Sequence, residues 1–272
     1  MDITDNHFHL DPAGQKENAV KAFLKSGGTR LVLVHKPYSP WKKIDQFKNQ
    51  VSTTLRLSEI AREAGAKVAV ISSPHPVQFL KLLDHYNSDE ASEIYLDAVD
   101  FCIDLVEEKQ IVGLGELGRP HFEVENSVWE QSNKILYESL KRAKEVDASV
   151  ILHTETGTPE VMADLANIAD KASFPKSRLV KHYGGIDSIK KSHGLAVSLL
   201  ASNENIAFAS KHNRPHMLET DYLDDPSRPG AVLGPKTVPR KTIKSFKEGI
   251  IDEEKFSRIH TDLPDYIYRE FI

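Results

Sequence analysis

Short apolar runs rich in β-branched residues recur along the chain, and each ends in polar or small residues. They predict strands at residues 3–8, 31–35, 67–72, 111–116, 149–153, 178–182, 195–200 and 216–221. Between them, apolar residues recur at spacings of three and four, as in NAVKAFLKSGG, LRLSEIAREAG and SNKILYESLKRAKEVD. This spacing predicts amphipathic helices, the first two ending at Gly27-Gly28 and at Gly65.

The alternation of strands and helices requires parallel pairing with right-handed crossovers. Eight such strands predict an α/β protein with a single closed (β/α)₈ barrel of TIM type, and an open doubly wound sheet is the alternative. The segments PRKTIKSFKEG, DEEKFSRIH and DLPDYIYREFI predict further helices. We therefore expect one domain over residues 1–272, with the barrel at about 3–250 and a helical tail at 251–272.

Composition narrows the class of protein. The chain has 272 residues, 40% hydrophobic and 28% charged, which is typical of a globular protein that can bury a full core. No apolar run approaches the roughly 20 residues of a membrane helix. The start, MDITDNHF, lacks an apolar signal core, so we expect a cytoplasmic location and no membrane partner. The net charge of −5 gives no general attraction for nucleic acid, so a phosphate-bearing substrate would need local binding groups.

Two imidazoles stand one residue apart in the first predicted strand. Because side chains alternate along a strand, His7 and His9 share one face while Phe8 points the other way. The two imidazoles, about 6–7 Å apart along the strand, either chelate one cation or lie together by coincidence on a solvated edge.

Six side chains that can bind a metal lie at or near the C-terminal ends of five predicted strands. They are His7, His9, Glu116, His153, His182 and Asp221. In a barrel these ends converge on the face where active sites are built. Imidazoles and carboxylates together suit Zn²⁺, Mn²⁺, Ni²⁺ or Fe²⁺ better than Ca²⁺. Because six ligands exceed the three usual for one catalytic zinc, the set favours two ions that share a carboxylate, with Glu116 as the bridge.

The motifs DNHFHLD, SSPHP, GLGELG, ILHTETG, VKHYGG and LETDYL occur in this order from residue 3 to about 240. In order and spacing the chain resembles the TatD-type metal-dependent hydrolases, a branch of the amidohydrolase-like barrels. The resemblance implies a TIM-type barrel with one or two divalent ions, either Mg²⁺ or a transition metal. It implies one ion at His7, His9, Glu116 and Asp221, and another at Glu116, His153 and His182. The family usually hydrolyses phosphodiesters, typically in DNA.

Three segments depart from the family pattern and indicate a divergent branch. Arg119-Pro120-His121 stands where the family commonly has Leu-Asp, VKHYGG replaces His-x-Phe-Ser-Gly, and the loop DDPSRPGAVLGPKTVPR is not the standard Asn-Glu-Pro segment. The chemistry can be retained while the substrate differs. No lysine ends the predicted fourth strand, so the carbamylated-lysine bridge of other amidohydrolase branches has no candidate there.

These observations predict a hydrolase that uses a metal-activated water. Asp221 would accept the proton of that water and later protonate the leaving group, while Glu116 joins the two ions. A phosphodiester in DNA or RNA is the expected substrate. The alternatives are an amidohydrolase or lactonase acting on a small molecule, and a metal-binding barrel without catalysis. The sequence does not specify the oligomeric state.

Further residues carry weaker predictions. His75 follows the third strand and either orients a substrate oxyanion or bonds the backbone of its loop. Arg119 and His121 follow Glu116 directly and could hold a phosphate. Glu219 shares the face of Asp221 one layer deeper, which predicts a hydrogen bond to a ligand histidine or to a neighbouring strand.

Two more segments have both a structural and a functional interpretation. His35 and Lys36 end the second strand and either reach the pocket or serve packing. The cations at Lys236, Arg240, Lys241, Lys244 and Lys247 form either a solvated helix face or a rim that guides a phosphate backbone. Tyr38 and Trp41, interleaved with lysines after the second strand, suit stacking on a base.

Overall fold

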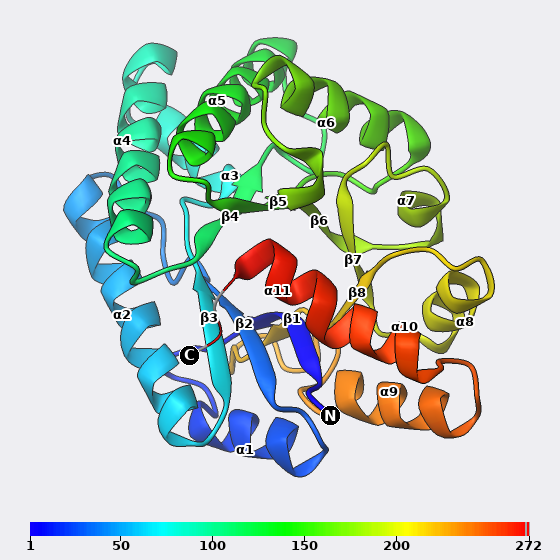
Figure 1. The fold of residues 1–272 in the computed structure, drawn as a ribbon. Coiled ribbons are helices and arrows are strands. Elements are labelled where there is room, and N and C mark those ends of the chain that lie inside the picture. The colour runs from blue at the N-terminus through cyan, green and yellow to red at the C-terminus, as the bar shows by residue number, and fades with distance from the viewer. Residues whose placement is uncertain (270, 272) are drawn as a thin grey trace.

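The strands of the protein form one parallel sheet, seen in a computed structural model that describes residues 1–269 and 271 (Figure 1). The strands are β1 (Thr4–His9), β2 (Arg30–Val34), β3 (Lys67–Ile71), β4 (Gly113–Gly118), β5 (Ser149–His153), β6 (Leu179–Gly184), β7 (Ala196–Leu200), β8 (Met217–Glu219) and β9 (Tyr222–Leu223). Their order in the sheet is β8-β7-β6-β5-β4-β3-β2-β1-β9. This is the TIM-type α/β fold that the alternation predicts.

Helices surround the curled sheet, and most strands are followed by one (Figure 1). They are α1 (Glu17–Lys25), α2 (Ile44–Glu63), α3 (Pro76–Leu83), α4 (Ser88–Glu107), α5 (Asn126–Glu145), α6 (Pro159–Lys171), α7 (Ile186–Lys190), α8 (Asn203–Lys211) and α9 (Thr237–Lys247). Side chains cap several helices. Asn87 accepts hydrogen bonds from backbone N–H groups in the first turn of α4, and Thr158 accepts one from the first turn of α6. Among residues 1–269 and 271, none of the helices combines the length and hydrophobicity that crossing a membrane requires.

The expected eighth strand is broken into two. The sequence predicts one strand over residues 216–221. In the structure, β8 ends at Glu219 and pairs with β7, whereas β9 begins at Tyr222 and pairs with β1. Between them Asp221 adopts a left-handed backbone with φ of 53°. The two ends of the sheet are therefore consecutive in the chain, and the break brings them next to each other.

A buried carboxylate joins β1 to the chain just after β8. Asp5 is fully buried, and its Oδ1 accepts from the backbone nitrogen of Thr220 at 2.9 Å while its Oδ2 accepts from the Thr220 hydroxyl at 2.7 Å. The backbone nitrogen of His7 lies 3.4 Å from the same Oδ1. One side chain thus holds together two segments from opposite ends of the sheet.

Two apolar cores stabilise the fold. The larger lies between the sheet and the surrounding helices, and includes Phe8, Phe23 and Phe47. The smaller fills the inside of the curled sheet and includes Val34, Ile71, Ile151, Val180 and Met217 together with Ile267 and Tyr268. Burial of side chains of this size contributes about 1.5–3 kcal/mol each.

The predicted helical tail consists of α10 (Glu253–Ser257), the π-helical stretch η2 (Arg258–Asp262) and α11 (Leu263–Tyr268). Figure 1 shows α11 lying across one end of the sheet, where its last turn places Ile267 and Tyr268 in the inner core. Residues 270 and 272, at the end of the predicted tail, lie outside the described residues. The division into a barrel at 3–250 and a tail at 251–272 stays a prediction.

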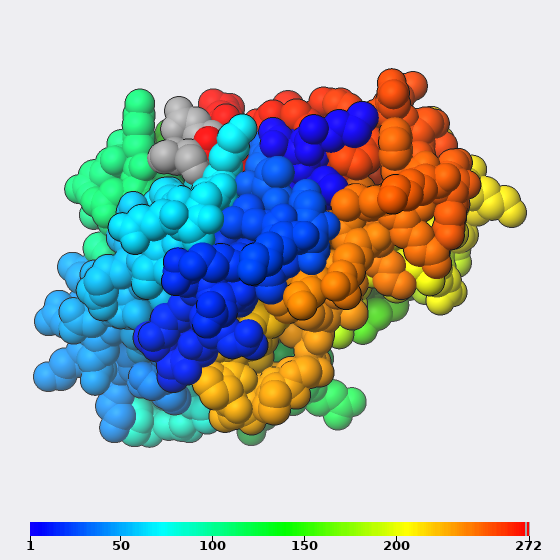
Figure 2. Space-filling model, turned by 90° about the horizontal axis from the view of Figure 1, so that it is seen from below, coloured from blue at the N-terminus to red at the C-terminus, as the bar shows by residue number. Residues whose placement is uncertain are grey.

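The start of the chain and the segment before α9 lie side by side, as Figure 2 shows in blue and orange. Hydrogen bonds join them: Asp224 accepts from the backbone nitrogens of Gln15 and Lys16, both at 2.8 Å. Because the loop after β1 and the loop after β9 are tied together, the side of the sheet where their strands end has a fixed rim.

Replacing Asp5 with alanine is expected to lower the free energy of unfolding by about 2–3 kcal/mol, because the buried Thr220 N–H loses its acceptor. Asp5→Asn retains an acceptor and should lose about 1 kcal/mol or less. Burial raises the pKa of Asp5 to about 7, so the neutral amide replaces a carboxyl that is half protonated near neutral pH. Urea unfolding followed by circular dichroism measures both variants. Equal losses of stability in the two variants would show that the acceptor oxygen of Asp5 does not account for the stabilisation.

Candidate metal centre

The six side chains predicted as ligands converge at the end of the sheet where the strands finish. β1 contributes His7 and His9, while Asp221 comes from the break between β8 and β9. The Nε2 atoms of the two histidines are 3.1 Å apart, and they lie 3.7 Å and 3.5 Å from Asp221 Oδ1 respectively. The alternation of side chains along β1 therefore places both imidazoles against one carboxylate, as the sequence predicts.

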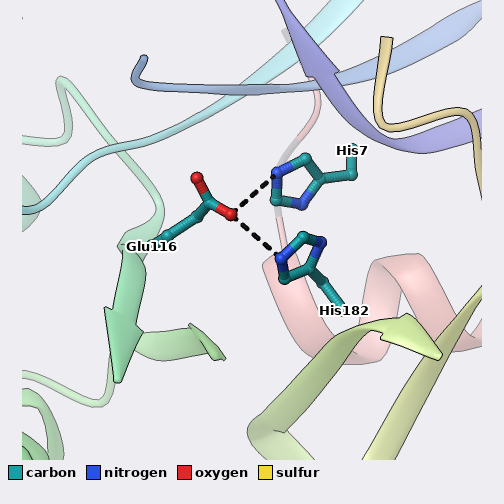
Figure 3. Close-up of side chains that lie close together, drawn as sticks. All are labelled: His7, Glu116 and His182. Carbon is teal, nitrogen blue, oxygen red and sulfur yellow. Dashed lines mark ion pairs between the residues drawn. The ribbon is translucent and has the colours of Figure 1, made fainter. Parts of the chain in front are cut away.

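Glu116, from β4, lies between this group and a second pair of imidazoles. Its Oε1 is 2.7 Å from His153 Nδ1 and 2.9 Å from His182 Nε2, and these two nitrogens are 3.1 Å apart. Figure 3 shows the same carboxylate facing His7, whose Nε2 lies 3.6 Å from Oε1. The other oxygen, Oε2, is 4.0 Å from His9 Nε2. One carboxylate thus faces both pairs of histidines.

Oxygen atoms on the outer side of two rings leave the inner nitrogens free to bind a cation. The Nδ1–H of His9 donates to the carbonyl of Val34 at 2.9 Å, and His182 Nδ1 lies 3.5 Å from Glu219 Oε1. Since each Nδ1 faces an oxygen that can only accept, each Nε2 can present its lone pair to the centre. Two nitrogens that bind one tetrahedral ion at 2.0–2.1 Å stand about 3.4 Å apart. The observed spacings of 3.1 Å fit such an ion.

Three overlapping groups satisfy the distance requirement for metal binding. They are His7 with Glu116 and His182, His7 with His9 and Asp221, and His75 with Glu116 and His153. In each group the potential ligand atoms lie within 4.8 Å of one another. Because Glu116 belongs to two groups and His7 to two, the arrangement can hold one ion or two neighbouring ions.

The charges of the cluster are coupled. Burial alone would raise the pKa of Glu116, but the neighbouring His153 and His182 hold it well below its usual range. Burial would lower the pKa of His182, yet the charge of Glu116 raises it to about 10. Burial, together with the charge of His182, lowers the pKa of His7. Without a cation, the carboxylate is thus ionised and is balanced by a proton on His182.

His75 lies at the edge of this cluster and its tautomer is determined by the backbone. Its Nδ1 accepts from the backbone nitrogen of Val77 at 3.2 Å, so it caps the start of α3. Burial lowers the pKa of His75 to about 3, so the ring is neutral and Nε2 carries the hydrogen. The ring centre lies 4.5 Å from that of His153. His75 is therefore a neutral hydrogen-bond donor beside the carboxylate.

Glu219 is buried beneath His182. Besides facing His182 Nδ1, its Oε1 accepts from the backbone nitrogen of Tyr183. The side chain is 0% exposed, so these contacts hold both His182 and the chain that follows it.

Arg119 and His121, predicted to contact phosphate, lie in different surroundings. The Arg119 guanidinium is buried and donates to Glu155 at 3.0 Å, to Asn133 at 2.8 Å and to Asp164. Its charge is thus engaged inside the protein. His121 is exposed, and its Nδ1 lies 3.1 Å from His153 Nε2. His121 therefore borders the cluster, whereas Arg119 holds the loops after β4 and β5 together.

The two side chains that follow the second strand have hydrogen-bond and ion-pair partners outside the cluster. His35 is buried and its Nδ1 lies 2.7 Å from the Thr54 hydroxyl, while Lys36 pairs with Asp11 and Asp225. These contacts favour the packing interpretation of both residues.

The expectation that Trp41 stacks on a base is wrong, because its ring is 2% exposed and packs against Phe47. Tyr38 is half-buried, and its hydroxyl lies 3.0 Å from that of Thr54. On α9, Lys241 donates to Asn203 and Lys244 pairs with Glu248. Arg240 and Lys247 of the same helix are exposed, as is Lys236 just before it.

Sequence reasoning missed three residues around the cluster. Asp5 could have been found, because it lies two residues before His7 and so shares its face of β1. Phe122 and Tyr183 are exposed beside cluster histidines. The signal for them was an aromatic residue directly after His121 and after His182 in the sequence.

Comparison with known proteins identifies the family and supports the fold. A family model described as "TatD related DNase" matches residues 4–269. An uncharacterized protein of Methanocaldococcus jannaschii is 31% identical over 277 residues, which covers 98% of this chain and 96% of the relative. The fold is similar to that of a TatD-like protein of Archaeoglobus fulgidus, with a TM-score of 0.65, 16% identity, and 97% and 99% of the two chains covered. It is also similar to a phosphotriesterase homology protein of Escherichia coli, complexed with phosphate in its active site, with a TM-score of 0.65, 14% identity and 98% of both chains covered.

Replacing Arg119 with lysine is expected to lower the free energy of unfolding by about 2 kcal/mol, because lysine cannot reproduce the paired bonds to Glu155 or the contact over Trp129. Arg142→Lys is the matched control, since Arg142 pairs with Asp100 and Glu138 on the surface and should lose less than about 0.5 kcal/mol. Thermal and urea unfolding measure both. If Arg119→Lys lowers the free energy of unfolding no more than Arg142→Lys does, Arg119 does not hold the loops after β4 and β5 together.

Proposed function

Because the chain belongs to the TatD-related DNase family, we propose that it is a divalent-metal-dependent hydrolase that cleaves phosphodiester bonds in nucleic acid. One observation carries the proposal: the Glu116 carboxylate lies between two pairs of imidazoles whose nitrogens are spaced as ligands of first-row cations are. Four imidazoles and two carboxylates suit Zn²⁺, Mn²⁺ or Ni²⁺, and the family resemblance adds Mg²⁺.

In this proposal, His7, His9 and Asp221 hold one ion and His153 and His182 hold the other. Glu116 contributes to both, because its two oxygens face different histidines. Outer contacts keep the ligands in place: the Val34 carbonyl orients His9, Glu219 orients His182, and His121 faces the outer nitrogen of His153.

The bound cations would supply Lewis acidity toward both the attacking water and the phosphoryl group. The chain's own residues would manage the protons. The Asp221 carboxylate, with 16% of its side chain exposed, is open to the mouth and lies against His7 and His9. It is the group that accepts the proton of the attacking water and returns it to the leaving oxygen.

His75 would act on the charge that develops at the phosphate. Since its Nδ1 is used by the backbone of α3, its Nε2–H is available as a donor to a non-bridging oxygen. A donor held in place before the reaction costs no reorganisation when the negative charge grows.

A substrate panel tests the proposed function. Protein supplied with Mn²⁺, Mg²⁺ or Zn²⁺ is assayed on single-stranded DNA, on a generic phosphodiester and on a lactone. We expect cleavage of the phosphodiesters and its loss with Asp221→Asn. Cleavage of the lactone alone would overturn the assignment in favour of a lactonase, and metal binding without hydrolysis would favour a non-catalytic barrel.

Metal uptake is expected to release protons. Since the pKa of His182 is raised to about 10 in the metal-free protein, its Nε2 is protonated at pH 7 and a cation must displace that proton. Apparent affinity should therefore rise with pH up to about pH 10. Calorimetry in buffers of different ionisation enthalpy should count about one proton or more released at pH 7. A pH-independent affinity would contradict the assignment.

Elemental analysis of the loaded protein tests the number of ions. The His153→Ala variant should hold about one ion fewer per chain than the unmodified protein, because it loses a nitrogen 2.7 Å from the shared carboxylate. His85→Ala, at an exposed histidine, is the control and should bind the unmodified amount. Unchanged content in His153→Ala would count against two ions.

The variant His75→Asn separates the two roles of His75. Asparagine is a good helix cap, so the stability of α3 should be preserved. The Nε2–H donor is lost, and kcat should fall about 10- to 100-fold with unchanged metal content. A kcat within twofold of the unmodified protein would remove His75 from the mechanism.

A further inference from the structure

Three aromatic side chains stand out as largely exposed in the part of the chain that the structure describes. They are Phe122 at 47%, Tyr183 at 51% and Tyr266 at 54%. Tyr266 lies on α11, which crosses the opposite end of the sheet from the candidate metal centre. The other two flank the centre itself. Single exposed apolar side chains are common on protein surfaces, so it is the position of these two rings beside cluster histidines that calls for a physical reason.

The two rings stand at the ends of a continuous series of ring contacts among the cluster histidines. The ring centres of Tyr183 and His182 are 6.1 Å apart, those of His182 and His153 are 5.2 Å apart, those of His153 and His121 are 5.0 Å apart, and those of His121 and Phe122 are 5.1 Å apart. Glu116 lies against the middle of this series, at His153 and His182. An exposed aromatic ring therefore stands at each end of the series of ring contacts that passes through the position where the chemistry is proposed to occur.

Tyr183 is held in its exposed position by the fold. Its backbone φ is 52°, a left-handed conformation that is unfavourable for a bulky residue. The buried Glu219 accepts from its backbone nitrogen and stabilises this conformation. Strain retained beside an active site indicates that the direction of the side chain has a use.

Phe122 is supported in a comparable way from the other side. It follows Arg119 by three residues, and the Arg119 guanidinium is bound to Glu155, Asn133 and Asp164. His121 between them faces His153. The loop that presents Phe122 is thus fastened at its start to the interior and in its middle to the cluster.

We propose that Tyr183 and Phe122 bind nucleobases of a single-stranded nucleic acid, one on each side of the scissile phosphate; this inference rests on the proposed function. Flat exposed rings stack on bases of any sequence. In a duplex the faces of the bases are covered by their neighbours, so only a single strand can offer them to both rings.

Charge supports the same conclusion. The net charge of −5 repels a polyanion, and Arg119, the cation nearest to Glu116 in the sequence, is engaged with carboxylates. Neither the net charge nor Arg119 therefore adds affinity for a phosphate backbone to that of the metal centre. Stacking supplies affinity that does not depend on a basic surface.

Fluorescence anisotropy of a labelled single-stranded DNA oligonucleotide, with EDTA present, measures binding without turnover. The matched probe is an oligonucleotide of the same length built from abasic sites. Tyr183→Leu and Phe122→Leu should each weaken binding of the base-bearing strand about tenfold and leave the abasic strand unchanged. Tyr183→Phe, which keeps a ring, and Tyr266→Leu, at the third exposed aromatic, should stay within twofold. Thermal unfolding confirms that each variant folds.

Cleavage assays with Mn²⁺ then separate this inference from the proposed function. We expect the leucine variants to raise KM for the base-bearing strand by the same factor with kcat within threefold. If the unmodified protein cleaves DNA but neither leucine variant changes binding or KM, the stacking inference is overturned and the proposed function stands. Equal affinity for abasic and base-bearing strands would also overturn it. If no cation supports cleavage, the proposed function fails, and anisotropy alone still decides whether the two rings hold bases.

Discussion

The contact between Asp5 and Thr220 is the constraint on which the rest of the centre depends. β1 carries His7 and His9, and Asp221 follows Thr220 directly, so the ligands of one proposed ion come from both ends of the sheet. The Asp5 carboxylate binds the backbone and hydroxyl of Thr220 and lies 3.4 Å from the backbone nitrogen of His7. Fully desolvated hydrogen bonds of this kind are rigid, because breaking one leaves a buried group without a partner. The position of Asp221 relative to the two histidines is therefore set one layer below them.

A cluster of buried imidazoles and carboxylates does not stabilise the fold that contains it. Removing such groups from water costs several kcal/mol for each charge, and only good pairing offsets that cost. Stability comes instead from the apolar layer between sheet and helices and from the inner core, where Ile267 and Tyr268 of the last helix fill the end opposite the cluster. The protein thus separates its stabilising contacts from its polar centre, and the mouth is left open for ligands.

The sequence predicted the site better than it predicted the details of the chain around it. Strand periodicity and the parallel barrel rule require only local information, and they placed His7, His9, Glu116 and His153 at one mouth. The break after β8 follows from how two strand ends meet, and no local pattern around Asp221 encodes it. Exposure of an aromatic ring is likewise a tertiary property: Trp41 is covered because Phe47 packs on it, whereas nothing in the described chain covers Phe122 to the same degree.

The departures from the family pattern lie around the centre and not within it. Arg119, His121 and Tyr183 belong to the segments in which the sequence departs from the pattern of the family it resembles, yet the proposed ligand atoms that they surround lie within metal-binding distances. The fold explains how the surrounding residues can differ while the distances within the cluster are retained. Tyr183 is fixed through its backbone by Glu219, and the loop of His121 is fixed through the buried guanidinium of Arg119. The contacts of Glu219 and Arg119 do not involve the proposed ligand atoms. Substitutions at the rim can therefore alter which substrate binds without moving the atoms proposed to perform the chemistry.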